Sequence, residues 1–140
     1  MGAFILCSCL IEAIAGFIKG SDTTRKDYKD FVKQYMPKYD EGKLYKDLRC
    51  KLIHSYSEGG SYLFKDGKPN LHLEKDSSGK TFINLEDFIN EIDEALSCYE
   101  SNLLNNLDLI KKAIKRYNKN GIIQVKSLSS LSIPASGSNI

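Results

Sequence analysis

Residues 84–117 read NLEDFINEIDEALSCYESNLLNNLDLIKKAIKRY, and apolar side chains recur along this stretch at spacings of three and four. That period is typical of one face of an α-helix, and Asn84 is a favourable residue to cap its start. One helix of about 33 residues would span roughly 50 Å, too long to bury its whole stripe in a small domain. The stretch therefore predicts dimerisation through part of a long last helix. The alternative is a break at the weak helix formers Asn105 and Asn106, which would give two shorter helices.

Three further helices are predicted upstream, over residues 3–19, 24–36 and about 41–55. Each range shows helical spacing of apolar residues. Gly20 is expected to end the first helix and Pro37 to stop the second. Asp22 or Thr23 is expected to cap the second helix.

Between residues 58 and 84 the pattern changes to turn signals and short alternating segments. The segments 61–65, 71–75 and 80–83 alternate with a period of two, as strands do. We therefore expect a small antiparallel hairpin or three-strand insert over about 60–84. His72 lies in this insert, and a lone histidine in a strand is usually an exposed or packed bystander.

These elements predict a mainly α protein, an up-and-down bundle of four to five helices carrying a small β-hairpin insert. The length of 140 residues suits a single core. We expect one helical domain over residues 1–126 and a disordered, serine-rich tail over residues 127–140.

Composition excludes several classes of protein. The net charge of +2 and pI of about 8.3 are too mild to indicate a dedicated nucleic-acid surface, so any RNA contact should be local. Four cysteines, spaced C-x-C at the N-terminus, and two histidines support no zinc site, so neither metal nor cofactor is expected. All four cysteines are expected in helices as buried free thiols in a reducing cytoplasm. The apolar residues 4–18 lack a preceding basic residue and contain Glu12, which favours a core helix over a signal or membrane segment.

The stretch LRCKLIHSY, residues 48–56, contains the residue types suited to phosphate binding and proton transfer. It places His54 five positions after Arg49 and Tyr56 two positions further on. Histidine can accept or donate a proton near neutral pH, and the arginine fork can hold a phosphate at two points. One arginine and one histidine are too few for metal-free RNA cleavage, whereas two copies related by a two-fold axis would supply two of each. Residues five apart on an α-helix do not share a face, which also favours a composite site at a dimer interface.

This R-x4-H-x-Y string resembles the signature of the HEPN superfamily (higher eukaryotes and prokaryotes nucleotide-binding). The resemblance implies a dimeric helical bundle whose copies face each other across a cleft, acting as a metal-independent ribonuclease. It implies that Arg49 and His54 are the catalytic pair. It also implies that Tyr56 matches a tyrosine found in toxins of toxin–antitoxin pairs, where a partner nucleotidyltransferase modifies it.

Two residues are expected to support the motif, and three functions remain open. Glu12 is either a surface residue or a carboxylate that orients Arg49, and Asp47 is a second candidate partner of that arginine. Active members of the HEPN superfamily often have a polar residue after the arginine, where this chain has Cys50. The chain is therefore expected to be an endoribonuclease acting on RNA, a non-catalytic module binding a nucleotide, RNA or protein, or a structural helical oligomer. Neither DNA nor a membrane is an expected partner.

Overall fold

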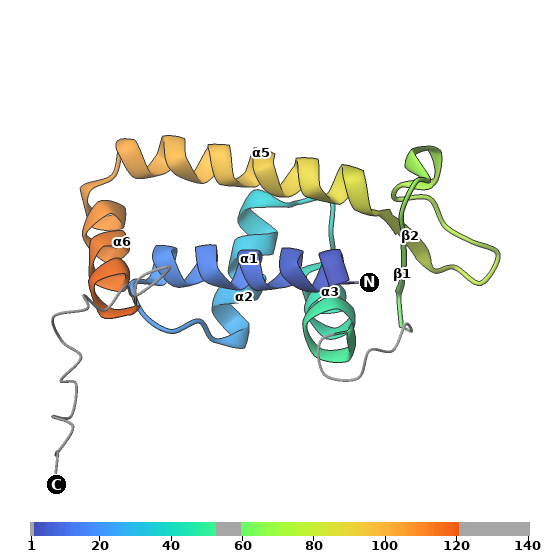
Figure 1. Cartoon of the computed structure of the whole chain (residues 1–140), viewed down its shortest axis with the longest axis horizontal. Helices are drawn as coiled ribbons and strands as arrows, with labels where there is room; N and C mark the ends of the chain where they lie inside the picture. The colour runs from blue at the N-terminus through green and yellow to red at the C-terminus, as the bar shows by residue number, and fades with distance from the viewer. Residues whose placement is uncertain (1, 53–59, 121–140) are drawn as a thin grey trace, which may run out of the picture.

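A computed structural model describes residues 2–52 and 60–120 of the protein. Helices dominate the fold, which confirms the predicted mainly α class (Figure 1). In chain order the elements are α1 (Gly2–Lys19), α2 (Arg25–Tyr35), α3 (Glu41–Leu44), η1 (Tyr45–Leu52), β1 (Tyr62–Lys65), η2 (Pro69–Leu71), β2 (Thr81–Asn84), α5 (Leu85–Leu104) and α6 (Leu107–Asn120).

The helices pack around one core that every larger element except α6 helps to form. Figure 1 shows α1 and α5 side by side and running in the same direction, so this pair departs from strict up-and-down order. The largest fully buried apolar side chains come from α1, α2, the α3–η1 segment, β2 and α5; they are Ile11, Tyr28, Phe31, Val32, Leu44, Leu48, Leu52, Ile83 and Phe88.

Helix α1 is long and apolar enough to qualify by length and composition as a membrane-spanning candidate, with a mean hydropathy of 1.8 over 18 residues. Within the fold, seven of its residues are buried, and it packs against α2, η1, α5 and α6. Its exposed positions, which include Leu6 and Leu10, carry no charge.

Gly20 ends α1, as predicted, with a backbone φ of +81° that favours glycine. Its N–H donates to the carbonyl of Gly16 at 2.8 Å. A Cβ at Gly20 would lie 3.0 Å from the Cβ of Lys112 and 3.1 Å from its backbone. The glycine therefore permits both the end of α1 and the close approach of α6.

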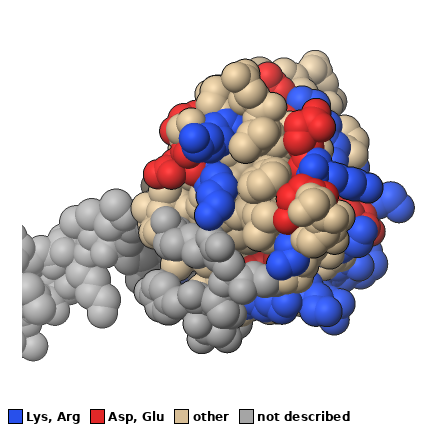
Figure 2. Space-filling model, turned by 90° about the vertical axis from the view of Figure 1, so that its right-hand side faces the viewer, with Lys and Arg blue, Asp and Glu red and all other residues tan. Residues whose placement is uncertain are grey.

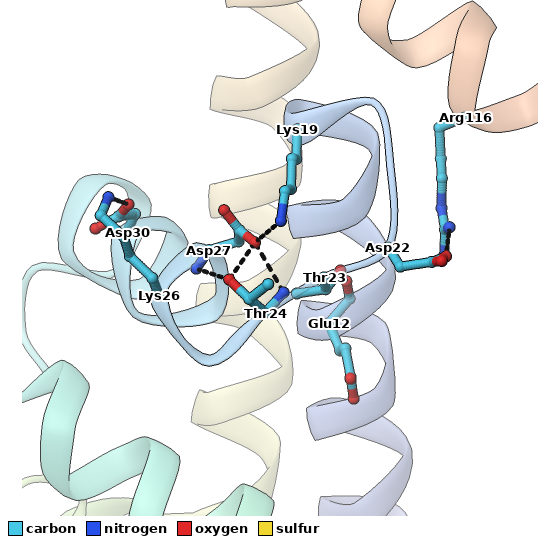
Figure 3. A network of polar contacts seen from close by, with 9 residues as sticks. All are labelled: Glu12, Lys19, Asp22, Thr23, Thr24, Lys26, Asp27, Asp30 and Arg116. Carbon is cyan, nitrogen blue, oxygen red and sulfur yellow. Dashed lines mark hydrogen bonds and ion pairs between the residues drawn. The ribbon is translucent and has the colours of Figure 1, made fainter.

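A polar network joins α1, α2 and α6 (Figure 3). The predicted caps of α2 are wrong, because Thr24 caps it and forms a capping box with Asp27. Lys19 at the end of α1 donates to Asp27 at 2.6 Å. Thr23 instead donates to the carbonyl of Glu12 at 2.7 Å, and Asp22 pairs with Arg116 of α6.

The predicted long last helix is wrong, and the alternative break holds. Helix α5 ends at Leu104 and α6 begins at Leu107. The side-chain oxygen of Asn106 accepts hydrogen bonds from the N–H groups of Asp108 and Leu109, at 3.0 and 3.2 Å. Asn106 thus caps a new helix, and such a side-chain bond competes with continuation of the old one.

The insert is not the predicted antiparallel hairpin, because β1 and β2 pair in parallel with Tyr62 opposite Thr81 and Phe64 opposite Ile83. The residues between the strands, 66–80, form a connection long enough for a parallel crossover. The predicted strand 71–75 is not a regular strand, but it adjoins β2 through an antiparallel bridge from Lys75 to Thr81 and through backbone hydrogen bonds of Leu73 and Glu74 with Phe82, both at 2.8 Å. This arrangement buries Tyr62, Phe64 and Ile83 together in the core.

Candidate functional site

The segment that carries Arg49 begins as α3 and continues as the π-helix η1. Asp40 caps α3 by accepting the N–H of Lys43 at 2.8 Å. Leu44, Leu48 and Leu52 are completely buried, as the predicted stripe requires. With this face fixed against the core, Arg49 lies at the partly exposed side of η1. π-helical turns occur frequently at functional sites.

Arg49 is held by Glu12 of α1 through two contacts. The Nε atom lies 2.7 Å from Oε2 of Glu12, and Nη2 donates to Oε1 at 3.3 Å. Both side chains remain partly exposed, Arg49 at 24% and Glu12 at 34%. Burial alone would lower the pKa of Arg49, but the hydrogen bond and charge of Glu12 outweigh it and raise that pKa. The guanidinium is therefore a permanent cation, oriented by Glu12 and partly exposed.

A second arginine lies near the same helix, which sequence reasoning did not single out. The guanidinium carbon of Arg25 lies 5.4 Å from the ring centroid of Tyr45, in η1. Tyr45 in turn packs edge-on against Tyr28, whose hydroxyl is 3.3 Å from that of Ser8. No periodicity in the sequence signals that Arg25 of α2 and Tyr45 of η1 meet.

Asp47, the second candidate partner of Arg49, is instead bound by the backbone of the insert. It is 2% exposed and accepts hydrogen bonds from the backbone N–H groups of Ser61 at 2.6 Å and Tyr62 at 3.1 Å. Lys51 lies 3.8 Å away. A Cβ at Gly60, where φ is +119°, would lie 2.1 Å from Oδ1 of Asp47. Asp47 therefore anchors the start of β1, and Gly60 lets the chain pass over it.

Of the other three residues singled out in the motif, Cys50, His54 and Tyr56, the structure describes only Cys50. His54 and Tyr56 fall in residues 53–59, outside the described part of the chain. Cys50, directly after Arg49, is partly buried. Cys7 is buried, but Cys9 and Cys98 are exposed, so the prediction of four buried thiols is wrong for two of them; all four are free.

His72 belongs to a separate buried cluster. Its Nδ1 accepts the N–H of Asn84 at 3.1 Å, so a neutral ring must carry its proton on Nε2. Nε2 faces the hydroxyl of Tyr39 at 3.3 Å and the carboxylate of Glu91 at 3.5 Å. Burial first, and then the Glu91 hydrogen bond, raise the pKa of Tyr39, which donates to Glu91. The histidine is therefore a packed residue that links the insert to Glu91 of α5, in line with the predicted packed bystander.

Comparisons with protein-family models, with curated proteins and with solved structures find no match to this chain.

Proposed function

We propose that this protein is a metal-independent endoribonuclease that acts as a homodimer, with Arg49 and His54 as its catalytic residues. The observation that carries the proposal is the state of Arg49. A motif arginine is oriented by a two-point contact with Glu12 and still keeps part of its surface accessible. A preoriented fork of this kind suits the stabilisation of charge on phosphoryl oxygens.

The proposed step needs no metal ion. The 2′-hydroxyl of the RNA attacks the adjacent phosphorus while a base removes its proton. The bond from phosphorus to the 5′-oxygen breaks, and an acid donates a proton to that oxygen. His54 of one copy serves as base and His54 of the other as acid, while the two Arg49 side chains stabilise the phosphoryl charge.

Exposed apolar residues near the C-terminal end of the described chain support a dimer. Leu107, Ile114 and Tyr117 of α6 are 66%, 55% and 60% exposed, and Leu104 precedes them at 79%. Their spacing places them along one side of the α5–α6 end. We propose this stripe as the homodimer contact, in the setting of a defence or toxin–antitoxin protein whose Tyr56 a partner nucleotidyltransferase modifies.

Cys50 favours a second candidate, a non-catalytic module that binds a nucleotide or RNA in the same dimer cleft. A half-buried thiol beside the arginine offers a weaker hydrogen-bonding group than the polar residue common in active members of the HEPN superfamily. This candidate predicts binding without turnover, weakened by Arg49→Ala and by added salt.

The deciding experiment incubates the purified protein with structured and single-stranded RNA in EDTA, beside the His54→Ala variant. We expect cleavage by the parent protein alone, with 2′,3′-cyclic phosphate ends. Cleavage that needs a divalent metal, or that survives in His54→Ala, would refute the proposal. Binding without cleavage by either protein would support the module instead.

A further inference from the structure

A cationic hollow lies between α3 and the insert. It has a volume of about 290 Å³ and is lined by Lys43 of α3 and by Lys75 and Lys80 of the insert. Gly60 and Gly79 also line it, together with four hydroxyl-bearing residues, Ser61, Tyr62, Ser78 and Thr81. Figure 2 shows lysine and arginine side chains gathered most densely on the right and lower right of the face that carries the insert.

A rigid turn holds two of the lysines in place. The carboxylate of Asp76 accepts hydrogen bonds from the N–H groups of Ser78 and Lys80, at 2.9 and 2.8 Å. The N–H of Asp76 donates to the carbonyl of Lys80 at 2.8 Å, and the backbone of Lys75 forms an antiparallel bridge with that of Thr81. Hydrogen bonds, from Ser78 above all, lower the pKa of Asp76 and keep it ionised within the turn. Lys75 and Lys80 therefore both stand on a turn whose backbone is fixed by hydrogen bonds, and both line the hollow.

Three carboxylates lie near the hollow, those of Asp40, Asp47 and Asp76, and Asp76 is close enough to Lys80 for the two charges to interact. No Asp or Glu is among the residues that line the hollow in the described chain. Asp40 lies 3.9 Å from Lys43, at the limit of an ion pair, and both side chains are at least half exposed. Asp47 lies beneath Gly60 but is buried and accepts the N–H groups of Ser61 and Tyr62. Three like charges around one hollow repel each other and favour a bound polyanion.

Two residues that line the hollow, Lys43 and Gly60, lie close in sequence to the motif, one before it and one after it. Lys43 and Arg49 lie on one continuous helical segment, α3 and η1. Gly60 follows directly after residues 53–59, which carry His54 and Tyr56. Arg49 faces Glu12 of α1, whereas Asp47 on the same segment faces the insert. A strand that extends from Arg49 across this segment towards the insert would bring its flanking phosphates to the three lysines.

We infer that Lys43, Lys75 and Lys80 bind the backbone phosphates of single-stranded RNA that flank the cleavage position. This inference rests on the proposed ribonuclease function, because it assigns the substrate's path at the same site. Lysine ammonium groups act as point charges on phosphate and carry no base preference, so the hollow adds affinity without sequence specificity. Three separate lysines around the hollow suit successive phosphates of a strand better than they suit a single phosphate.

The test measures binding of a 5′-labelled 12-nucleotide RNA by fluorescence anisotropy in EDTA. His54→Ala is the background, so that no RNA is cleaved. The affinity is followed from low to high salt with and without the triple change Lys43→Ala, Lys75→Ala, Lys80→Ala. For single strands the slope of log K against log salt is about −0.7 per phosphate contact, so the triple variant should lose a slope of about 2. At low salt its affinity should fall about tenfold or more.

A matched control removes three lysines that already pair with carboxylates. They are Lys26 with Asp30, Lys112 with Asp108 and Lys119 with Asp22. This control has the same net charge as the test variant and should keep the parent slope. Circular dichroism and thermal unfolding of both variants establish that they are folded.

Each outcome separates the two proposals. An unchanged slope in the folded triple variant, or an equal loss in the control, overturns the hollow as an RNA site even if the parent protein cleaves RNA. A loss of slope in a protein that never cleaves supports the hollow and refutes the ribonuclease. If the three lysines govern binding to vesicles of 30% phosphatidylserine but not to RNA, the hollow is a membrane contact and the inference fails.

Discussion

Asp47 and Arg49 lie two positions apart on one helical segment, yet the structure uses them in opposite ways. Asp47 is 2% exposed and its carboxylate is bound by two backbone N–H groups of the insert. Arg49 is 24% exposed and is bound by the side chain of Glu12, which is itself 34% exposed. Side chains two positions apart point to different sides of a helix, which lets one face hold the insert while the other faces α1.

The difference separates a buried structural charge from a partly exposed one. A buried carboxylate with backbone donors has no route to a ligand, and removing it would leave those donors without acceptors. An arginine that is itself partly exposed and paired with a partly exposed carboxylate remains in contact with solvent. Exposure of the partner, rather than the presence of an ion pair, therefore distinguishes the candidate catalytic residue.

The largest expected effect is that of Arg49→Ala on RNA cleavage. Loss of the group that stabilises phosphoryl charge should lower kcat about 100- to 1000-fold. The free energy of unfolding should change by at most about 1 kcal/mol, because the lost ion pair is partly exposed. Arg49→Lys keeps the charge without the fork and should recover only part of the rate. A large loss of stability in Arg49→Ala would instead place Arg49 with Asp47 as a structural residue.

Asp47→Ala should give the opposite pattern. It leaves the buried N–H groups of Ser61 and Tyr62 without an acceptor, at a cost of about 2–4 kcal/mol in unfolding free energy. Urea unfolding followed by circular dichroism measures this directly. Asp47→Asn retains one acceptor oxygen and should lose clearly less. If Asp47→Ala loses under about 1 kcal/mol, the insert does not depend on this anchor.

The sequence predicted the elements whose signals are local. Helical periodicity, Gly20 and Pro37 were enough for α1 and α2, whose observed ends lie within one or two residues of the predicted ones. The buried stripe Leu44, Leu48 and Leu52 was predicted for the same reason. The contact between Glu12 and Arg49 was one of two alternatives left open for Glu12, and it joins residues 37 positions apart.

Features that depend on tertiary contacts were not predictable in this way. The parallel pairing of β1 with β2 is decided by which faces reach the core, because period-two alternation carries no information on strand direction. Asp47 was expected beside Arg49, but its partners Ser61 and Tyr62 lie 14 and 15 positions later in the chain. The break between α5 and α6 was only an alternative, because one side chain, that of Asn106, decides it.

A third carboxylate, Asp27, tests the same principle through pH. Partial burial would raise the pKa of Asp27, but hydrogen bonds from Lys19 and Thr24 outweigh it and lower the pKa to about 2. A lowered pKa stabilises the fold above the ordinary value of about 4, and this contribution is lost as the pH falls towards 2. Asp27→Asn should therefore cost about 1–2 kcal/mol at pH 7 and progressively less between pH 4 and pH 2. A difference from the parent that stays constant over this range would contradict the assignment.

The smallest expected effect on RNA cleavage is that of Glu12→Gln, which tests directly how Glu12 acts on Arg49. If Glu12 positions Arg49, the neutral amide keeps a hydrogen-bond acceptor but loses the charge that fixes the fork. In Glu12→Gln we expect kcat to fall about threefold with KM nearly unchanged, and the unfolding free energy to change by less than about 1 kcal/mol. In Glu12→Ala we expect kcat to fall about tenfold. If Glu12 instead competes with phosphate for the guanidinium, Glu12→Gln would bind RNA more tightly than the parent protein. Tighter binding would make Glu12 a competitor of the substrate, and Arg49 would then be available only after that pair opens.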